Sequence, residues 1–72
     1  RIVDLLKDMA NERGLKVGYE VLLRQFFSHR EIAAMTGTSR QTVTKVLSDL
    51  KRSNLIHTDR KNILIRDMAN LA

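Results

Sequence analysis

Apolar residues recur at helical spacing in three segments of this 72-residue chain. Side chains three and four positions apart lie on the same face of a helix, so this spacing predicts amphipathic helices. We expect them over residues 1–13, 28–36 and 40–52. Their apolar stripes are Ile2, Leu5, Leu6 and Met9 in the first, Ile32 and Met35 with Thr36 in the second, and Val43, Val46, Leu47 and Leu50 in the third.

The residues that border the second and third segments carry end signals. Ser28 followed by Glu31 is a capping-box pattern, in which each side chain satisfies a backbone N–H of the other residue. Gly37 suits the left-handed conformation that ends a helix. Thr38 or Ser39 can cap the next helix. These signals predict two short helices joined by a tight turn, which is the layout of a helix-turn-helix.

Three further segments read as strands. A short strand is expected at Val21–Arg24, because its apolar centre is flanked by charges. After the third helix, residues 54–58 and 63–65 read as strands around the polar turn 59–62, which predicts a hairpin, or wing. The fold class is therefore mainly α with a small β-hairpin: a winged helix-turn-helix in the order helix, short strand, helix, helix, wing. Residues 67–72 are expected to add a last helical turn that packs Met68 and Leu71 on a core supplied by the three helices, and Gly14 is expected to end the first helix.

Phe26 and Phe27 precede the second helix and allow two interpretations. They can pack in the core and support the first helical turn. They can also stack bases, as aromatic pairs do in proteins that bind single strands. Only Tyr19 is present to extend such a platform. Core packing is therefore favoured.

The outer face of the third helix carries side chains that suit DNA. Gln41, Lys45, Ser48 and Arg52 lie opposite the apolar stripe, with Thr44 beside them and Arg40 at the helix start. Arg and Lys suit guanine or phosphate, and Gln suits adenine. Thr and Ser serve bases or phosphates. A solvated helix also shows water a polar face, so this helix alone does not separate the two interpretations.

The charge distribution favours the DNA interpretation. The formal net charge is +5, and most of the excess lies in residues 28–72, where eight basic residues face four acids. Such a field attracts a polyanion. The basic residues do not share one amphipathic helix with a bulky aromatic face, which argues against a membrane surface. Arg60 and Lys61 lie at the wing tip, where they can contact phosphate.

The sequence offers little support for a catalytic site or a metal site. His29 and His57 stand far apart, without a thiol or carboxylate at ligand spacing. Ser39 has no base in its neighbourhood. The three glycines are isolated, and no Gly-rich phosphate loop is present. We expect no enzyme activity. The chain contains no cysteine and no long apolar run, which fits a cytoplasmic protein.

The run from Phe27 to Leu55 resembles the C-terminal winged-helix domain of the cyclic-AMP receptor protein/fumarate–nitrate regulator (Crp/Fnr) family of bacterial transcription regulators. The resemblance rests on Phe27-Ser28, Arg30-Glu31-Ile32-Ala33, Gly37, Ser39-Arg40-Gln41-Thr42-Val43, Lys45-Val46-Leu47, Leu50 and Asn54-Leu55-Ile56. The Ser-Arg-x-Thr-Val block at its spacing from Gly37 is the most specific part. The remaining elements match the family more loosely.

The resemblance implies a recognition helix over residues 40–52 that enters the major groove. Positions matching Arg40, Gln41 and Lys45 read bases or the adjacent backbone in the family, and the position matching Ser28 touches phosphate. The best-known members have Glu in place of Gln41 and Arg in place of Lys45. Gln suits adenine where Glu accepts from cytosine, and Lys lacks the bidentate fork of Arg. The family operator therefore does not transfer to this chain.

The residue pattern and the family resemblance together predict sequence-specific binding of double-stranded DNA for regulation of transcription. The base-reading residues are Arg40, Gln41, Thr44 and Lys45, and the phosphate-contacting residues are Ser28, His29, Arg30, Ser39, Ser48, Arg60 and Lys61. No cofactor is expected within the 72 residues. The chain starts at Arg1 inside an amphipathic pattern, so we interpret it as a fragment.

The resemblance places a sensor domain, with an effector such as a cyclic nucleotide, and a long dimer helix before Arg1. It implies a homodimer and contact with RNA polymerase. The alternative functions are a protein–protein interaction module and a binder of structured RNA.

Overall fold

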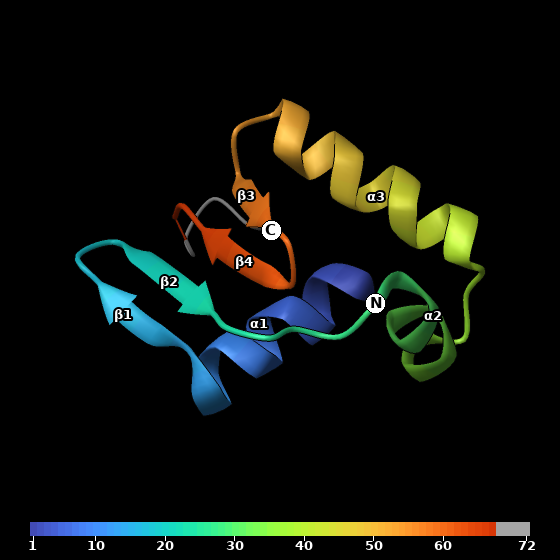
Figure 1. The fold of residues 1–72 in the computed structure, drawn as a ribbon, viewed down its shortest axis with the longest axis horizontal. Helices are drawn as coiled ribbons and strands as arrows, with labels where there is room; N and C mark the ends of the chain where they lie inside the picture. The colour runs from blue at the N-terminus through green and yellow to red at the C-terminus, as the bar shows by residue number, and fades with distance from the viewer. Residues whose placement is uncertain (68–72) are drawn as a thin grey trace.

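A computed structural model describes residues 1–67 of the chain. Its elements, in chain order, are α1 (Ile2–Arg13), β1 (Leu15–Val17), β2 (Glu20–Leu23), α2 (His29–Thr36), α3 (Arg40–Arg52), β3 (Ile56–Asp59) and β4 (Asn62–Ile65). The β1–β2 hairpin extends from one end of the molecule, and α2 lies at the other end (Figure 1). The three predicted helices are confirmed. The helical turn predicted for residues 67–72 lies, apart from Asp67, outside the described residues.

The hydrophobic core is shared by the helices and the sheet. Leu6 of α1 and Val43 of α3 are fully buried, as their stripes predict. The prediction that the helices supply the core is incomplete, because the strands contribute five buried side chains. These are Val21, Leu23, Ile56, Ile63 and Ile65. Met35, placed on the stripe of the second helix, is 48% exposed, and Ala33 fills the inner face of α2 instead.

The strands form one antiparallel sheet in the order β1-β2-β4-β3. The predicted strand at Val21–Arg24 begins and ends one residue earlier, at Glu20–Leu23. Strand β1 was not expected, because its three residues are all exposed and show no burial alternation. It is an edge strand that is held by pairing with β2. The loop between them is Gly18 and Tyr19, and Gly18 has a φ of 64°.

The predicted wing is confirmed as the β3–β4 hairpin. Asp59 pairs with Asn62, so the loop consists of Arg60 and Lys61 alone. Arg60 adopts a φ of 58°. This left-handed conformation is energetically unfavourable for a residue that has a Cβ atom. Strand β4 pairs with β2 on its other edge, and this pairing joins the wing to the rest of the sheet.

Gly14 follows α1 for a reason that the sequence did not indicate. Its φ of −75° and ψ of 145° are extended rather than left-handed. A Cβ atom at this position would collide with the side chain of Val21 and lie 2.6 Å from the carbonyl oxygen of Ala10. Glycine is therefore required for the close approach of β2 to the end of α1.

Phe26 and Phe27 pack in and against the core, as the favoured interpretation predicts. Phe26 is 4% exposed, and Phe27 is half-buried. Their ring centroids lie 5.2 Å apart with a tilt of 59°. The guanidinium of Arg13 covers the Phe27 ring at 5.8 Å from its centroid. An aromatic platform for stacking bases is not formed.

Candidate nucleic-acid interface

The start of α2 is held by the capping box that the sequence predicts. The Glu31 N–H donates to Oγ of Ser28 at 3.2 Å, and the Ser28 N–H donates to the Glu31 carboxylate at 2.8 Å. The hydrogen bond from the Ser28 backbone, with smaller contributions from its side chain and from the charge of Lys61, lowers the pKa of Glu31. Ser28 Oγ accepts one bond and keeps its own proton to donate.

The turn between α2 and α3 is built on Gly37. Its φ of 70° and ψ of 30° are left-handed, and the N–H groups of Gly37 and Thr38 both donate to the Ala33 carbonyl oxygen. Of the two candidate caps for α3, Ser39 is used, since its Oγ accepts from the Thr42 N–H at 3.1 Å. The Arg1 guanidinium donates to the Thr36 carbonyl oxygen at 3.1 Å and ties the start of α1 to the end of α2.

Helix α3 separates a buried face from a polar face. Val43 and Leu47 are buried, whereas all six predicted outer residues are exposed. These are Arg40, Gln41, Thr44, Lys45, Ser48 and Arg52. The helix ends at Arg52, and Asn54 two residues further on has a φ of 65°. The Asn54 N–H donates to the Lys51 carbonyl oxygen, and the Leu55 N–H donates to the Leu50 carbonyl oxygen. These two bonds form a Schellman motif, which sets the direction in which the chain enters the wing.

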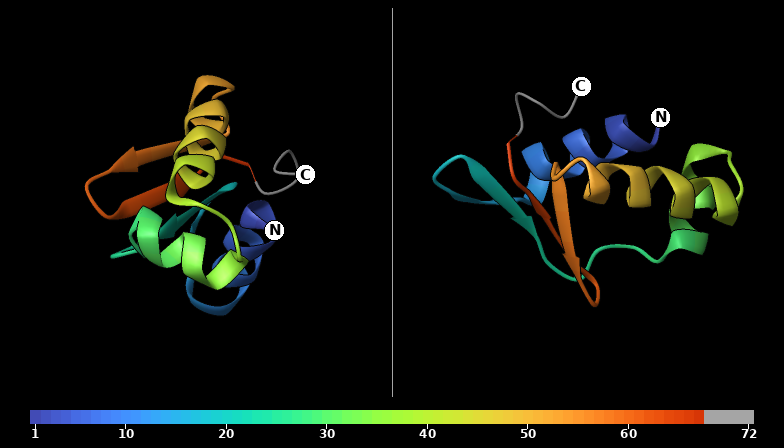
Figure 2. Two further views of the ribbon diagram at one scale, coloured as in Figure 1. Left: turned by 90° about the vertical axis from the view of Figure 1, so that its right-hand side faces the viewer. Right: turned by 90° about the horizontal axis from the view of Figure 1, so that it is seen from above.

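The wing tip is fastened to the segment that leads into α2. The Phe26 N–H donates to the carbonyl oxygen of Lys61, and the Gln25 N–H donates to Oδ1 of Asn62 at 3.0 Å. Figure 2 shows the β3–β4 turn beside this segment. Because the backbone of Lys61 is held there, the cationic tip lies next to the start of α2.

Two depressions open where these elements meet. A groove of about 220 Å³ lies between α2, α3 and the wing, with Phe26, Ile32 and Leu47 in its floor. The polar side chains that line it are Ser28, His29, Ser48, Lys51, Thr58, Arg60 and Lys61. A second, more open depression is lined by Ser28, His29, Arg30, Arg40 and Thr44. The charged side chains that line the two depressions are all cationic, and the ring of His29 borders both.

The two depressions bring most of the predicted site residues together. Ser39 lies at the start of α3 with its hydroxyl bonded to Thr42, and Gln41 and Lys45 are exposed on α3 outside both depressions. Lys51 was missed by the sequence analysis. Its position three residues after Ser48, on the same side of the helix, was the available signal. His57 lies in β3, away from the groove residues.

One hydrogen bond crosses from α2 to α3 within the second depression. Nδ1 of His29 lies 2.8 Å from Oγ1 of Thr44, with the proton on either atom according to the tautomer of the imidazole. Both side chains are exposed. The predicted phosphate contact at His29 and the predicted base contact at Thr44 are thus joined directly.

Residues 1–67 contain neither a metal-binding cluster nor a membrane-spanning helix. Within this range, no group of three His, Cys, Asp or Glu side chains is arranged to hold a metal ion. Likewise, none of the helices described combines the length and the apolar character needed to cross a bilayer.

The fold and its exposed polar helix define a winged helix-turn-helix domain. The whole chain, residues 1–72, matches the model of the Crp-like helix-turn-helix domain, and the chain belongs to this family. The resemblance seen in the sequence is therefore confirmed.

Individual relatives agree with the family assignment. The chain is 32% identical over 72 residues to the CRP-like cAMP-activated global transcriptional regulator of Mycobacterium tuberculosis, covering all of this chain and 32% of that protein. It is 46% identical over 44 residues to the transcriptional regulator LdrP of Thermus thermophilus, covering 61% of this chain and 23% of that protein. The chain thus spans about a third of the length of the first relative.

Solved structures give the same result. Oxidised CprK in complex with o-chlorophenolacetic acid superposes with a TM-score of 0.90 at 28% identity, over 99% of this chain and 30% of that chain. The CO-dependent transcription factor CooA from Carboxydothermus hydrogenoformans has a TM-score of 0.89 at 33% identity, over 99% and 33% of the respective chains. The predicted fold class is confirmed, and so is DNA binding in transcription regulation as the function of this kind of domain.

Proposed function

We propose that this domain binds double-stranded DNA in a sequence-specific manner with α3 in the major groove. The observation that carries the proposal is the grouping of α3, the start of α2 and the wing tip around two depressions whose charged residues are cationic. A helix of this size fits the major groove, and basic side chains on either side of it can neutralise the flanking phosphates.

The proposal divides the interface into two sets of contacts. The residues that read base edges are Arg40, Gln41, Thr44 and Lys45. The residues that position the domain on phosphates are Ser28, His29, Arg30, Ser39, Ser48, Arg60 and Lys61, to which the groove adds Lys51. The O–H of Ser28 and the free N–H groups in the first turn of α2 support a phosphate contact there.

The whole protein is proposed to be a longer, homodimeric regulator. Two such domains would bind half-sites about one helical turn apart, and linking them would raise the affinity well above that of one domain. A sensor domain before Arg1 would bind the effector, and contact with RNA polymerase would follow at the promoter. Action on bacterial chromosomal DNA would place the protein in the cytoplasm.

Selection of bound duplexes from a random pool, with the full-length protein, tests the function. We expect an operator to emerge, with affinity that falls steeply as salt rises. Arg40→Ala should cost about 1–3 kcal/mol on this operator and relax base preference at one position. If Arg40→Ala lost the same affinity for the operator and for random duplex, Arg40 would not be a base-reading residue.

A protein–protein module and a binder of structured RNA are the alternatives. The exposed face of α3 offers no aromatic or large aliphatic anchor of the kind that protein hot spots use. Binding to hairpin RNA that equals binding to duplex DNA, or enrichment of no sequence from the pool, would contradict the proposed function.

A further inference from the structure

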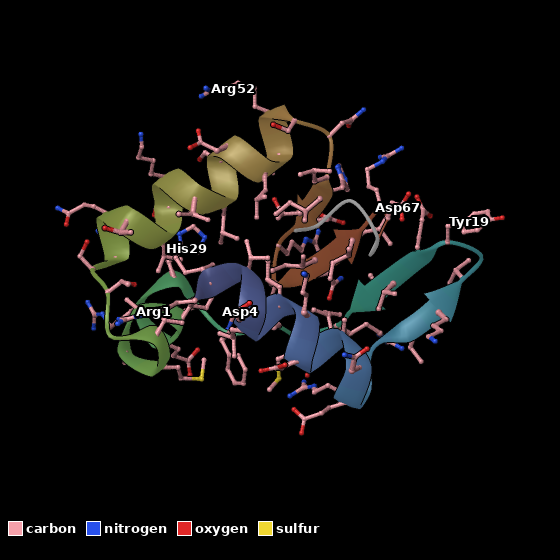
Figure 3. All side chains as sticks on the ribbon, turned by 180° about the vertical axis from the view of Figure 1, so that it is seen from behind. Arg1, Asp4, Tyr19, His29, Arg52 and Asp67 are labelled. Carbon is pink, nitrogen blue, oxygen red and sulfur yellow. The ribbon has the colours of Figure 1, made fainter. Side chains whose placement is uncertain are left out.

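The hydrogen bond between His29 and Thr44 links two groups that the proposed function treats separately. His29 is the first residue of α2, and Thr44 lies on the outer face of α3. Figure 3 shows the His29 side chain pointing from α2 toward α3. Only Nδ1 takes part in the 2.8 Å bond, so Nε2 is available for another partner.

The surroundings of His29 favour an anionic partner for Nε2. Its ring borders both depressions, and the charged side chains that line them with it are Arg30, Arg40, Lys51, Arg60 and Lys61. The nearest acid along α2, Glu31, has its carboxylate engaged by the Ser28 N–H. A DNA phosphate is the anion that such a cationic surface attracts.

We propose that His29 is a positioning residue that makes Thr44 a hydrogen-bond acceptor toward the bases. This inference rests on the proposed function. Nε2–H of His29 donates to a phosphate oxygen, and the unprotonated Nδ1 accepts a hydrogen bond from the Thr44 hydroxyl. Oγ1 of Thr44 then presents only lone pairs to the major groove. It accepts from an exocyclic amino group, N6 of adenine or N4 of cytosine.

The direction of each of these hydrogen bonds follows from which groups can donate and which can only accept. A phosphate oxygen only accepts, so the nitrogen that faces it must carry the proton of a neutral imidazole. The tautomer of a histidine is set by the hydrogen bond that its other nitrogen makes. In the major groove, adenine and cytosine present amino donors, whereas guanine O6 and N7 and thymine O4 only accept. Without His29, the Thr44 hydroxyl can rotate and either donate or accept, and this discrimination disappears.

A panel of duplexes bound by the full-length protein tests the inference. Thr44→Val first identifies the operator position that Thr44 reads, and all four base pairs are then placed there. The unaltered protein should bind the adenine and cytosine duplexes about fivefold more tightly than the other two, as expected for one hydrogen bond. His29→Phe keeps a ring without nitrogens and should bring this ratio below about twofold, with preferences at other positions unchanged.

Matched variants separate positioning from other roles. Thr44→Ser keeps the hydroxyl and should keep the preference for adenine and cytosine. Combining His29→Phe with Thr44→Val should change base preference no further than Thr44→Val alone. Arg30→Ala, which removes a neighbouring proposed phosphate contact, should weaken all four duplexes equally. Both His29 and Thr44 are exposed, so thermal unfolding should confirm that each variant is folded.

Three results would overturn the inference while leaving the proposed function intact. They are no change of base preference in Thr44→Val, a preference of the unaltered protein for guanine or thymine at the Thr44 position, and an equal loss on all four duplexes in His29→Phe. Failure of the unaltered protein to select any duplex would overturn the proposed function together with this inference.

Discussion

The β1–β2 and β3–β4 hairpins lie in one sheet and each closes with a two-residue loop, yet their tips differ in chemistry and in attachment. The first tip carries Gly18 and Tyr19, with Tyr19 88% exposed, and extends away from the helices. The second carries Arg60 and Lys61 and is bonded to the segment before α2. Strand pairing alone therefore does not give a hairpin a role in the interface.

The difference extends to backbone strain. The first loop places a glycine at its positive φ, where no Cβ atom is strained. The wing places Arg60 in the same region at 58°. A cation is thus kept at the tip although glycine would fit the turn better. Conformational cost of this kind occurs where function requires a particular side chain. The comparison supports a role for the wing tip in binding and gives no such support for the other tip.

The largest effect is expected at β4, the strand of the wing that pairs with β2 of the other hairpin. Ile65 of β4 is fully buried and lies opposite Val21 of β2 and Ile56 of β3. Ile65→Ala should lower the free energy of unfolding by about 2–5 kcal/mol, because it removes apolar contacts and leaves a cavity. Leu15→Ala on the exposed edge strand should stay within about 0.5 kcal/mol. Denaturant unfolding measures both, and similar losses would show that β1 is part of the stabilising core.

The two loops should respond in opposite directions to changes at their positive-φ residues. Gly18→Ala should destabilise the domain by about 1 kcal/mol, since alanine is strained at a φ of 64°. Arg60→Gly should relieve strain and leave stability unchanged or slightly raised, despite the extra freedom of the unfolded chain. Thermal unfolding at low salt gives both values. A large loss in Arg60→Gly would mean that the arginine side chain stabilises the wing.

The lysines of the two hairpins should differ in their effect on DNA affinity. Lys61→Ala should weaken binding about fivefold on every duplex and lower the slope of log K against log salt by about one. Lys16→Ala in β1 removes the same charge from the other hairpin and serves as the matched control, with no change in slope. Titration of operator and random duplex over a range of salt measures both. Equal slopes for the two variants would contradict a specific contact at the wing.

The smallest effect concerns the capping box, which lies beside the wing tip. The pKa of Glu31 in the folded protein is lowered from its ordinary value of 4.5. A carboxyl whose pKa is lowered on folding stabilises the protein above its unfolded pKa, and this contribution is lost as the pH falls through the lower folded value. Stability of the unaltered domain should therefore fall more below about pH 5 than that of Glu31→Gln.

The neighbouring charges refine this last expectation. Lys61 contributes to the lowered pKa of Glu31, so Lys61→Ala should raise that pKa slightly, and Lys16→Ala should not. Titration of Glu31 followed by NMR gives the two values. An unchanged pKa in Lys61→Ala would show that the hydrogen bonds from Ser28 account for the whole shift.

Local chemistry made most of the fold predictable. The capping box at Ser28 and the left-handed turn at Gly37 depend on residues within a few positions of each other, and both were recognisable in the sequence. Strand β1 was not, because its residues are exposed and it is held in place by pairing with β2. Gly14 ends α1 as expected, but the sequence did not show that glycine is needed there for the approach of Val21, a contact between separate elements.

The candidate site divides in the same way. The helical period of α3 assigned Arg40, Gln41, Thr44 and Lys45 to one exposed face, and that assignment required no tertiary information. The sequence therefore determined the helix-turn-helix, the family and the polar character of the outer face of α3, since these depend on short-range spacing. Only the tertiary structure decided that Lys51 joins the groove, that the wing tip is held beside α2, and that His29 meets Thr44. Each of these depends on contacts between elements, which spacing along the chain does not specify.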